Sequence, residues 1–375
     1  MSPSQNEITP TGFLDRFRKS WFPPAAVVGA FAAFVAAAFR VRPTPIPAPR
    51  SADSPGTPGP PYQSPGTGSV ARVFDWEYTR TAVLGGTEST HPFLRTLRGI
   101  AVGADDRILA LGDDEIRIFD SGGIFVEYWR APEKAGCLTV SPDGRIFVGA
   151  ADRVEIHDGS GNRAGGFAVG EIGKPGDVTA IKVFRKEILV ADAAARFIRR
   201  YDSDGRQLGV IGTKSKTGGF ILPNRSLDIA VNSRGVVYAT DTGRHQVTAW
   251  TLDGSPLDSF GKFGMSDPKD FVGCCNPVNL ALLPDGKIVT AEKMVARVKV
   301  YAPEGRLLAV IGPEHFDPQC THIHVVADPK GRILAADPVR REIGVFSRLV
   351  KAGTNGPSDT LCPAVDGKPQ EPEPA

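Results

Sequence analysis

Apolar residues in the middle of the chain fall into short runs of four to six positions, each bounded by a turn signal. Runs such as ILAL (108–111), IFVGA (146–150) and ILVA (188–191) are almost wholly apolar, and tetrads such as SPDG and LPDG lie between them. Runs of this length predict strands, and continuous apolar character predicts strands buried on both faces. No part of this region has an apolar stripe with a 3.6-residue period. The pattern therefore predicts an all-β domain with few helices.

The strands recur as six copies of one unit. Each copy has a run, a turn, a second run that ends near an acidic residue, a third run and a glycine turn. The copies start at Gly99, Cys137, Thr179, Asp228, Asn279 and His324, at spacings of 38, 42, 49, 51 and 45 residues. Units this short do not form independent cores, but they bury both faces when they stack radially. The repeat predicts a six-bladed β-propeller over residues 70–350.

The sixth unit lacks the last strand and glycine turn of the other five. The segment RVFDWEYTRTAVL (72–84) has the composition of a strand and belongs to no unit. We expect this amino-terminal strand to complete the sixth blade and close the ring, which removes exposed sheet edges.

The repeat resembles the NHL repeat. The shared pattern is I-A-V-x-x-x-G-x-[IV]-x-[VA]-x-D followed by a turn and x-[IV]-x-x-[FYW]-[DT]-x-x-G, and its clearest copy is Ile229–Gly254. Units two and three depart from it, with Ala150 and Lys186-Glu187 where an acid and a glycine are usual. The resemblance implies the six-bladed fold, in a family that includes protein-binding sensor domains on membrane receptors, RNA-binding domains and a peptide-amidating lyase. The GCCNP segment (273–277) is similar to one in bacterial membrane-anchored NHL proteins.

The amino-terminal region predicts a membrane anchor. Residues 1–20 are expected to form a short cytoplasmic tail, and residues 21–39 contain no charged side chain. As a helix this run is roughly 28 Å long, close to the hydrocarbon thickness of a bilayer. We interpret it as an uncleaved signal anchor that places the propeller on the periplasmic side of a bacterial inner membrane. The alternative is a secretory signal peptide cleaved near Ala38, followed by secretion.

Two further segments are predicted to lack a fold. Residues 40–69 are rich in proline and have no apolar pattern, as expected of a disordered, semi-rigid linker. Residues 351–375 have a similar composition and are expected to be a disordered tail. Lys and Arg number 44 against 42 Asp and Glu. This balance gives no basic footprint, so no nucleic-acid partner is expected.

Acidic residues recur at the end of the second run of several units: Asp192, Asp241, Glu292 and Asp337. Their periodicity follows the blades, so we interpret them as acceptors for turn backbone within each blade and not as a catalytic ring.

A cysteine- and histidine-containing constellation precedes the last two units. A shift of 45 residues maps Cys275 onto Cys320, and His322 and His324 follow directly. Equivalent positions of adjacent blades face the same rim, so three interpretations stay open. The two thiols form a disulfide, or they join His322 and His324 in a zinc or copper site, or they are unpaired buried cysteines.

The start positions of the six units are expected to meet at the mouth of the central channel. Among them Asp228, Asn279 and His324 offer ligands for a hard cation such as calcium. The chain contains no G-x-S-x-G, H-E-x-x-H, P-loop or dinucleotide motif. The sequence therefore favours a membrane-anchored propeller that binds a protein, peptide or small ligand. The alternative is a metal-dependent hydrolase or lyase with its site at the channel mouth.

Overall fold

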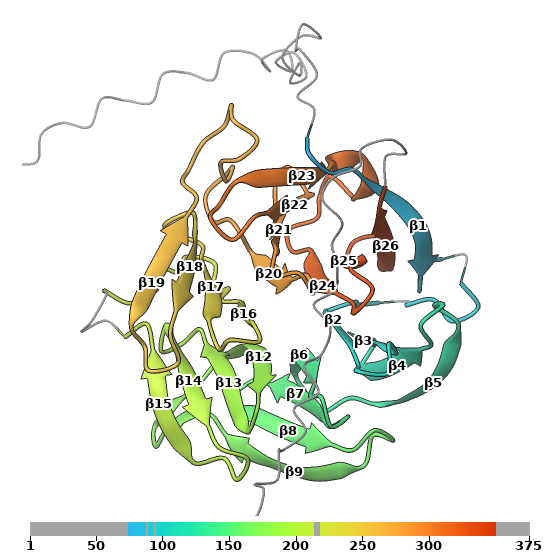
Figure 1. Cartoon of the computed structure of the whole chain (residues 1–375). Coiled ribbons are helices and arrows are strands. Elements are labelled where there is room, and N and C mark those ends of the chain that lie inside the picture. The colour runs from blue at the N-terminus through green and yellow to red at the C-terminus, as the bar shows by residue number, and fades with distance from the viewer. Residues whose placement is uncertain (1–73, 88, 94, 214–217, 350–375) are drawn as a thin grey trace, which may run out of the picture. The chain divides into compact units, whose positions relative to one another are not determined.

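The computed structural model describes residues 74–349 except 88, 94 and 214–217, and it shows six four-stranded antiparallel sheets arranged around a central axis (Figure 1). In the first five blades the strand nearest the axis comes first along the chain, and in the sixth blade the outermost strand is the first strand of the domain. The first three blades consist of β2 (Gly99–Val102), β3 (Ile108–Gly112), β4 (Glu115–Phe119) and β5 (Phe125–Arg130); β6 (Ala135–Val140), β7 (Ile146–Ala150), β8 (Arg153–His157) and β9 (Arg163–Ala168); and β12 (Val178–Phe184), β13 (Glu187–Asp192), β14 (Phe197–Tyr201) and β15 (Gln207–Ile211).

The remaining blades repeat this order. They consist of β16 (Ile229–Val231), β17 (Val237–Asp241), β18 (Gln246–Trp250) and β19 (Pro256–Phe260); β20 (Asn279–Leu282), β21 (Ile288–Glu292), β22 (Arg297–Tyr301) and β23 (Leu307–Ile311); and β24 (His324–Ala327), β25 (Ile333–Asp337), β26 (Glu342–Arg348) and β1 (Tyr78–Leu84). A hairpin of β10 (Gly170–Glu171) and β11 (Lys174–Pro175) lies outside the blades, and the short 3₁₀ helix η1 (Pro313–His315) precedes the sixth.

Apolar side chains are buried between the blades. The described residues form six hydrophobic clusters, and each cluster draws its members from two neighbouring blades. The second strand of each blade is buried along its whole length or nearly so, as in β3, β7 and β17. The continuous apolar runs of the sequence are thus explained, because these strands contact another blade on both faces.

The ring closes as the sequence predicts. β1 pairs antiparallel with β26 over Tyr78–Leu84, so the amino-terminal strand completes the sixth blade (Figure 1). Leu84 is 3% exposed and packs in the cluster between the sixth and first blades, whereas its neighbour Val83 is 46% exposed.

The periodic acidic residues hold loops, which confirms their structural interpretation. Asp192 accepts backbone N–H bonds from Ala194 and Ala195 in its own turn, and from Asp177 in the loop before its blade. Asp337 likewise accepts from the N–H groups of Val339 and Arg340 in its own turn, and from Asp317 in the loop before its blade. In the first blade a similar role falls to Asp113, directly after β3, which accepts from the N–H groups of Arg95 and Thr96 and which the sequence analysis missed.

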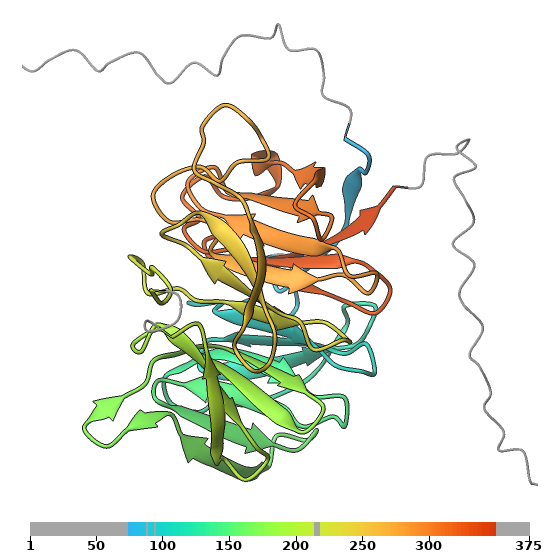
Figure 2. The same ribbon diagram turned by 60° about the vertical axis from the view of Figure 1, so that its left-hand side comes forward.

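We give the name top face to the face at which the innermost strands begin, and bottom face to the one at which they end (Figure 2). The top face carries the long loops 212–228 and 261–278, and the bottom face carries the short SPDG-type turns. Within residues 74–349 as described, no helix is long and apolar enough to cross a membrane. The predicted anchor, linker and carboxy-terminal tail lie outside the described residues.

Replacing Leu84 with Ala is expected to lower the free energy of unfolding by about 2–5 kcal/mol, because it opens a cavity in the cluster that joins the last blade to the first. Val83→Ala, one residue away on the exposed side of the same strand, should change it by less than about 0.5 kcal/mol. Urea unfolding of both variants measures the difference. Equal effects would contradict a closing role for β1.

Candidate functional site

The six start positions converge, as the sequence predicts. One cavity of about 30 Å³ on the axis is lined by all six of them: Gly99, Cys137, Thr179, Asp228, Asn279 and His324. A second axial cavity of about 180 Å³ shares Ile100, Lys182 and Val326 with the first, and its other lining residues are almost all apolar. The mouth has room for one or two water molecules.

Polar side chains at the mouth connect the third, fourth and fifth blades each to the following blade. Asp228 Oδ2 accepts from Leu280 N of the fifth blade at 2.8 Å, and Asn279 Oδ1 accepts from Val325 N of the sixth at 2.7 Å. In the opposite sense, Thr179 Oγ1 donates to the carbonyl of Leu227 at 2.7 Å. The oxygens predicted to coordinate a cation therefore already accept backbone hydrogen bonds between blades.

Burial shifts the pKa values of titratable side chains at and near the mouth. Burial raises the pKa of Asp228 above its ordinary value, although nearby Lys182 and the N–H groups of Leu280 and Ile229 act in the opposite direction. Burial also lowers the pKa of His324 well below its ordinary value and that of His322 to about 4. Both imidazoles are thus neutral at physiological pH. Their ring centroids lie 4.5 Å apart.

Of the three arrangements that the sequence left open for Cys275 and Cys320, the structure has the unpaired, buried one. Cys275 and Cys320 are both free and buried, and no disulfide joins them in the structure. Cys320 packs in the hydrophobic cluster between the fifth and sixth blades, whereas the Sγ atom of Cys275 lies 3.4 Å from that of Cys274. The structure brings His322 and His324 together. It gathers no group of three or more His, Cys, Asp or Glu side chains suited to a metal in the described part of the chain. The zinc, copper or calcium site stays a prediction.

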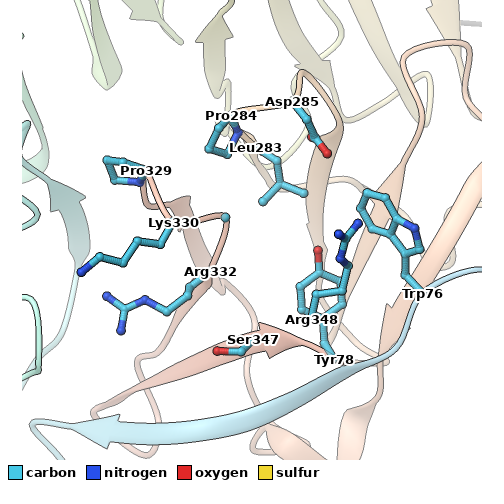
Figure 3. A pocket seen from close by; sticks show the side chains of 11 residues that line it. Trp76, Tyr78, Leu283, Pro284, Asp285, Pro329, Lys330, Arg332, Ser347 and Arg348 are labelled. Carbon is cyan, nitrogen blue, oxygen red and sulfur yellow. The ribbon is translucent and has the colours of Figure 1, made fainter. Parts of the chain in front are cut away.

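A pocket beside the ring closure was missed by the sequence analysis. It has a volume of about 390 Å³ and lies on the bottom face between the fifth and sixth blades (Figure 3). We call it the seam pocket. Its walls come from four segments, namely the start of β1, the SPDG-type turns of the fifth and sixth blades, and the end of β26: Trp76, Tyr78, Leu283, Pro284, Asp285, Pro329, Lys330, Gly331, Arg332, Ser347 and Arg348.

Aromatic and cationic groups define one side of the seam pocket. The guanidinium of Arg348 lies 4.4 Å from the centre of the Trp76 ring, and the Lys287 ammonium lies 4.5 Å from it. Beside them burial raises the pKa of Tyr78 to about 12, so its hydroxyl stays protonated. Backbone bonds from Trp76 N to Leu308 O (3.1 Å) and from Leu349 N to Glu77 O (2.8 Å) fix this side of the pocket.

Most charges around the pocket are compensated. Lys330 pairs with Asp106 of the first blade at 3.1 Å, Arg332 pairs with Asp328, and Lys287 pairs with Asp285 at 2.7 Å. Arg348, which is exposed, has no acidic partner among the residues that the structure describes. The pocket therefore combines an available guanidinium with an aromatic ring and two prolines.

Comparisons with known proteins agree on the fold. No protein-family model matches the chain. A protein of unknown function from Bacteroides thetaiotaomicron is similar in structure, with a TM-score of 0.53 and 14% identity over 73% of this chain and 72% of that one. The WD40 β-propeller domain of Doa1 has a TM-score of 0.50 and 16% identity, covering 72% and 97% of the two chains.

This chain is a six-bladed β-propeller. A virginiamycin B lyase from Staphylococcus aureus is a further structural neighbour, with a TM-score of 0.48 and 14% identity over 73% of this chain and all of that one (100%). At identities this low, structural similarity supports the fold alone. The function of the propeller has to be argued from its own residues.

Asp228→Ala is expected to lower the free energy of unfolding by about 1–3 kcal/mol, because the buried Leu280 N–H loses its acceptor. Asp228→Asn keeps an acceptor oxygen and should cost less. Since the folded pKa of Asp228 is raised, its contribution to stability is complete below about pH 4 and declines as the pH rises towards the folded value.

The stability difference between wild type and Asp228→Asn should therefore fall as the pH rises above about 4. Urea unfolding across this range measures it, with Asp204→Asn in an exposed turn as the matched control. A difference independent of pH would show that Asp228 is not a buried carboxylate of raised pKa.

Proposed function

We propose that this propeller is a membrane-anchored, extracytoplasmic binding module, and that its seam pocket takes an acidic segment of a protein or peptide. The observation that carries the proposal is the exposed Arg348 guanidinium, stacked on Trp76 beside a pocket of about 390 Å³. Ligand pockets commonly have volumes of about 300–1,000 Å³ and combine apolar walls with a few placed polar groups.

The chemistry of the walls specifies the ligand class. The planar guanidinium of Arg348 can donate two parallel hydrogen bonds to a carboxylate. Trp76, Pro284 and Pro329 supply flat apolar surfaces on which a proline or an aromatic ring of the ligand packs. The best match is a peptide that carries Glu or Asp next to proline or an aromatic residue.

Sequence features support a location outside the cytoplasm. The uncharged segment 21–39 and the proline-rich segment 40–69 support an anchor and a spacer that present the propeller outside the cytoplasm. The NHL-like repeat and the GCCNP segment support a place among membrane-anchored NHL-type propellers. Trp76, near the start of the described chain, lines the seam pocket.

The alternative function, a metal-dependent hydrolase or lyase, has less support. Its expected site is the channel mouth, which has a volume of about 30 Å³ and whose Asp228 and Asn279 oxygens accept inter-blade hydrogen bonds. A substrate there would have to displace contacts that hold the blades together.

Binding of labelled peptides that contain Glu-Pro or Glu-aromatic pairs tests the proposal, measured by fluorescence anisotropy with Gln-for-Glu peptides as controls. Arg348→Glu is expected to weaken binding at least about tenfold, because it replaces attraction by repulsion at the carboxylate. Lys186→Glu reverses an exposed cation on the bottom face of the third blade and should leave binding unchanged. Equal affinity for the Glu and Gln peptides would refute the acidic ligand class.

A further inference from the structure

The described cysteines differ sharply in their surroundings. Cys137, Cys275 and Cys320 are buried, whereas Cys274 is exposed on the top face. Burial raises the pKa of both Cys137 and Cys320 to about 12, so these two thiols stay protonated and unreactive. Cys274 and Cys275 are adjacent in the chain, and their Sγ atoms lie 3.4 Å apart. Within the described part of the chain, one exposed thiol is therefore in contact with one buried thiol.

Hydrogen bonds hold the loop on both sides of the two thiols. Glu292, at the end of β21, accepts from Val272 N at 3.0 Å. The Asn276 side chain accepts from Lys293 N at 3.0 Å and donates to the Lys293 carbonyl at 3.1 Å. Residues 272 and 276 are thus both held to the fifth blade, which limits the motion of the segment between them.

A neighbouring blade holds the same loop from the other direction. His245 Nε2 donates to the Gly273 carbonyl at 2.7 Å. Such fixation keeps the two sulfur atoms together and lowers the entropy lost when they react with one partner. The arrangement of the exposed and the buried thiol sets the order in which they react.

We propose that Cys274 and Cys275 form a vicinal dithiol site that a small disulfide donor oxidises. The Cys274 thiolate attacks one sulfur of the donor, forms a mixed disulfide and releases the first donor thiolate. Cys275 then loses its proton and attacks Cys274 Sγ, which forms the Cys274–Cys275 bond and releases the second donor thiolate. The donor disulfide is reduced to two thiols, which take up the two protons, and the protein dithiol is oxidised by two electrons.

A disulfide between adjacent residues is reversible for a geometric reason. Consecutive Cα atoms are about 3.8 Å apart across a trans peptide, whereas disulfides usually join Cα atoms about 4.4–6.8 Å apart. The bond is therefore strained, and strained, exposed disulfides are the readily reduced ones. The site is suited to reversible thiol exchange and not to stapling the fold.

Exposed apolar side chains lie beside the two thiols, so the reaction would alter the surface of the top face. The Met294 side chain lies against Gly273, and the ring centroids of Phe263 and His245 are 5.3 Å apart. Phe263 and Met294 are 54% and 64% exposed. Closing the Cys274–Cys275 bond has to rearrange residues 273–276, and so it changes this apolar part of the top face.

Oxidised glutathione is the probe, applied to the full chain with Cys362→Ser in every sample so that the tail contributes no thiol. Intact mass and peptide mapping should show loss of two hydrogens at residues 274–275 with no glutathione retained. Cys275→Ser should retain one glutathione on Cys274, because the resolving thiol is gone. Cys274→Ser should react at least about tenfold more slowly, since the remaining thiols are buried. The control Cys320→Ser should be oxidised like the parent.

A second measurement does not depend on substitutions. Phenylarsine oxide bridges two close thiols, so the reduced parent protein should bind one equivalent and thereby become resistant to oxidised glutathione. A lasting glutathione adduct on Cys274 of the parent would overturn the proposal. A bond between Cys275 and Cys320, or no arsenical bound, would also overturn it.

Discussion

Burial of apolar side chains between adjacent blades is the constraint on which this structure depends. Each of the six hydrophobic clusters in the described chain is shared by two blades, so no blade has a complete core without both neighbours. A linear array would leave two apolar faces open. The ring removes both faces, and it does so by pairing β1 with β26. Three hydrogen bonds to the following blade, donated by Thr179 and accepted by Asp228 and Asn279, add directional contacts to an interface that is otherwise apolar.

The same closure determines where the molecule offers a pocket. Because the last blade is built from both ends of the domain, Trp76 and Arg348 meet at one seam although they are far apart in the sequence (Figure 3). At the channel mouth, by contrast, polar side chains are committed to holding blades together. This division explains why the seam pocket, and not the axis, is the better candidate for recognition.

Much of the fold could be predicted from the sequence, because a propeller repeats one local pattern. The apolar runs located the strands, the repeat gave six blades, and the unassigned segment 72–84 indicated the closing strand. The acids at the ends of β13 and β25 were also interpreted correctly, since an acceptor for turn backbone acts within its own blade. Convergence of the start positions followed from symmetry.

Side-chain partners outside the repeat were not predictable in this way. Cys275 and Cys320 are equivalent by a 45-residue shift, but the loop before β20 (261–278) is longer than the loop before β24 (312–323). Equivalent positions in unequal loops follow different paths, so Cys275 contacts Cys274 instead. The seam pocket has no sequence signal, because its walls meet only after closure. The central claim is that recognition takes place there. Hydrogen–deuterium exchange of the full chain with and without a Glu-Pro peptide tests it most directly. The account predicts protection confined to residues 76–78, 283–287, 328–332 and 345–348, and protection of the top-face loops instead would contradict it.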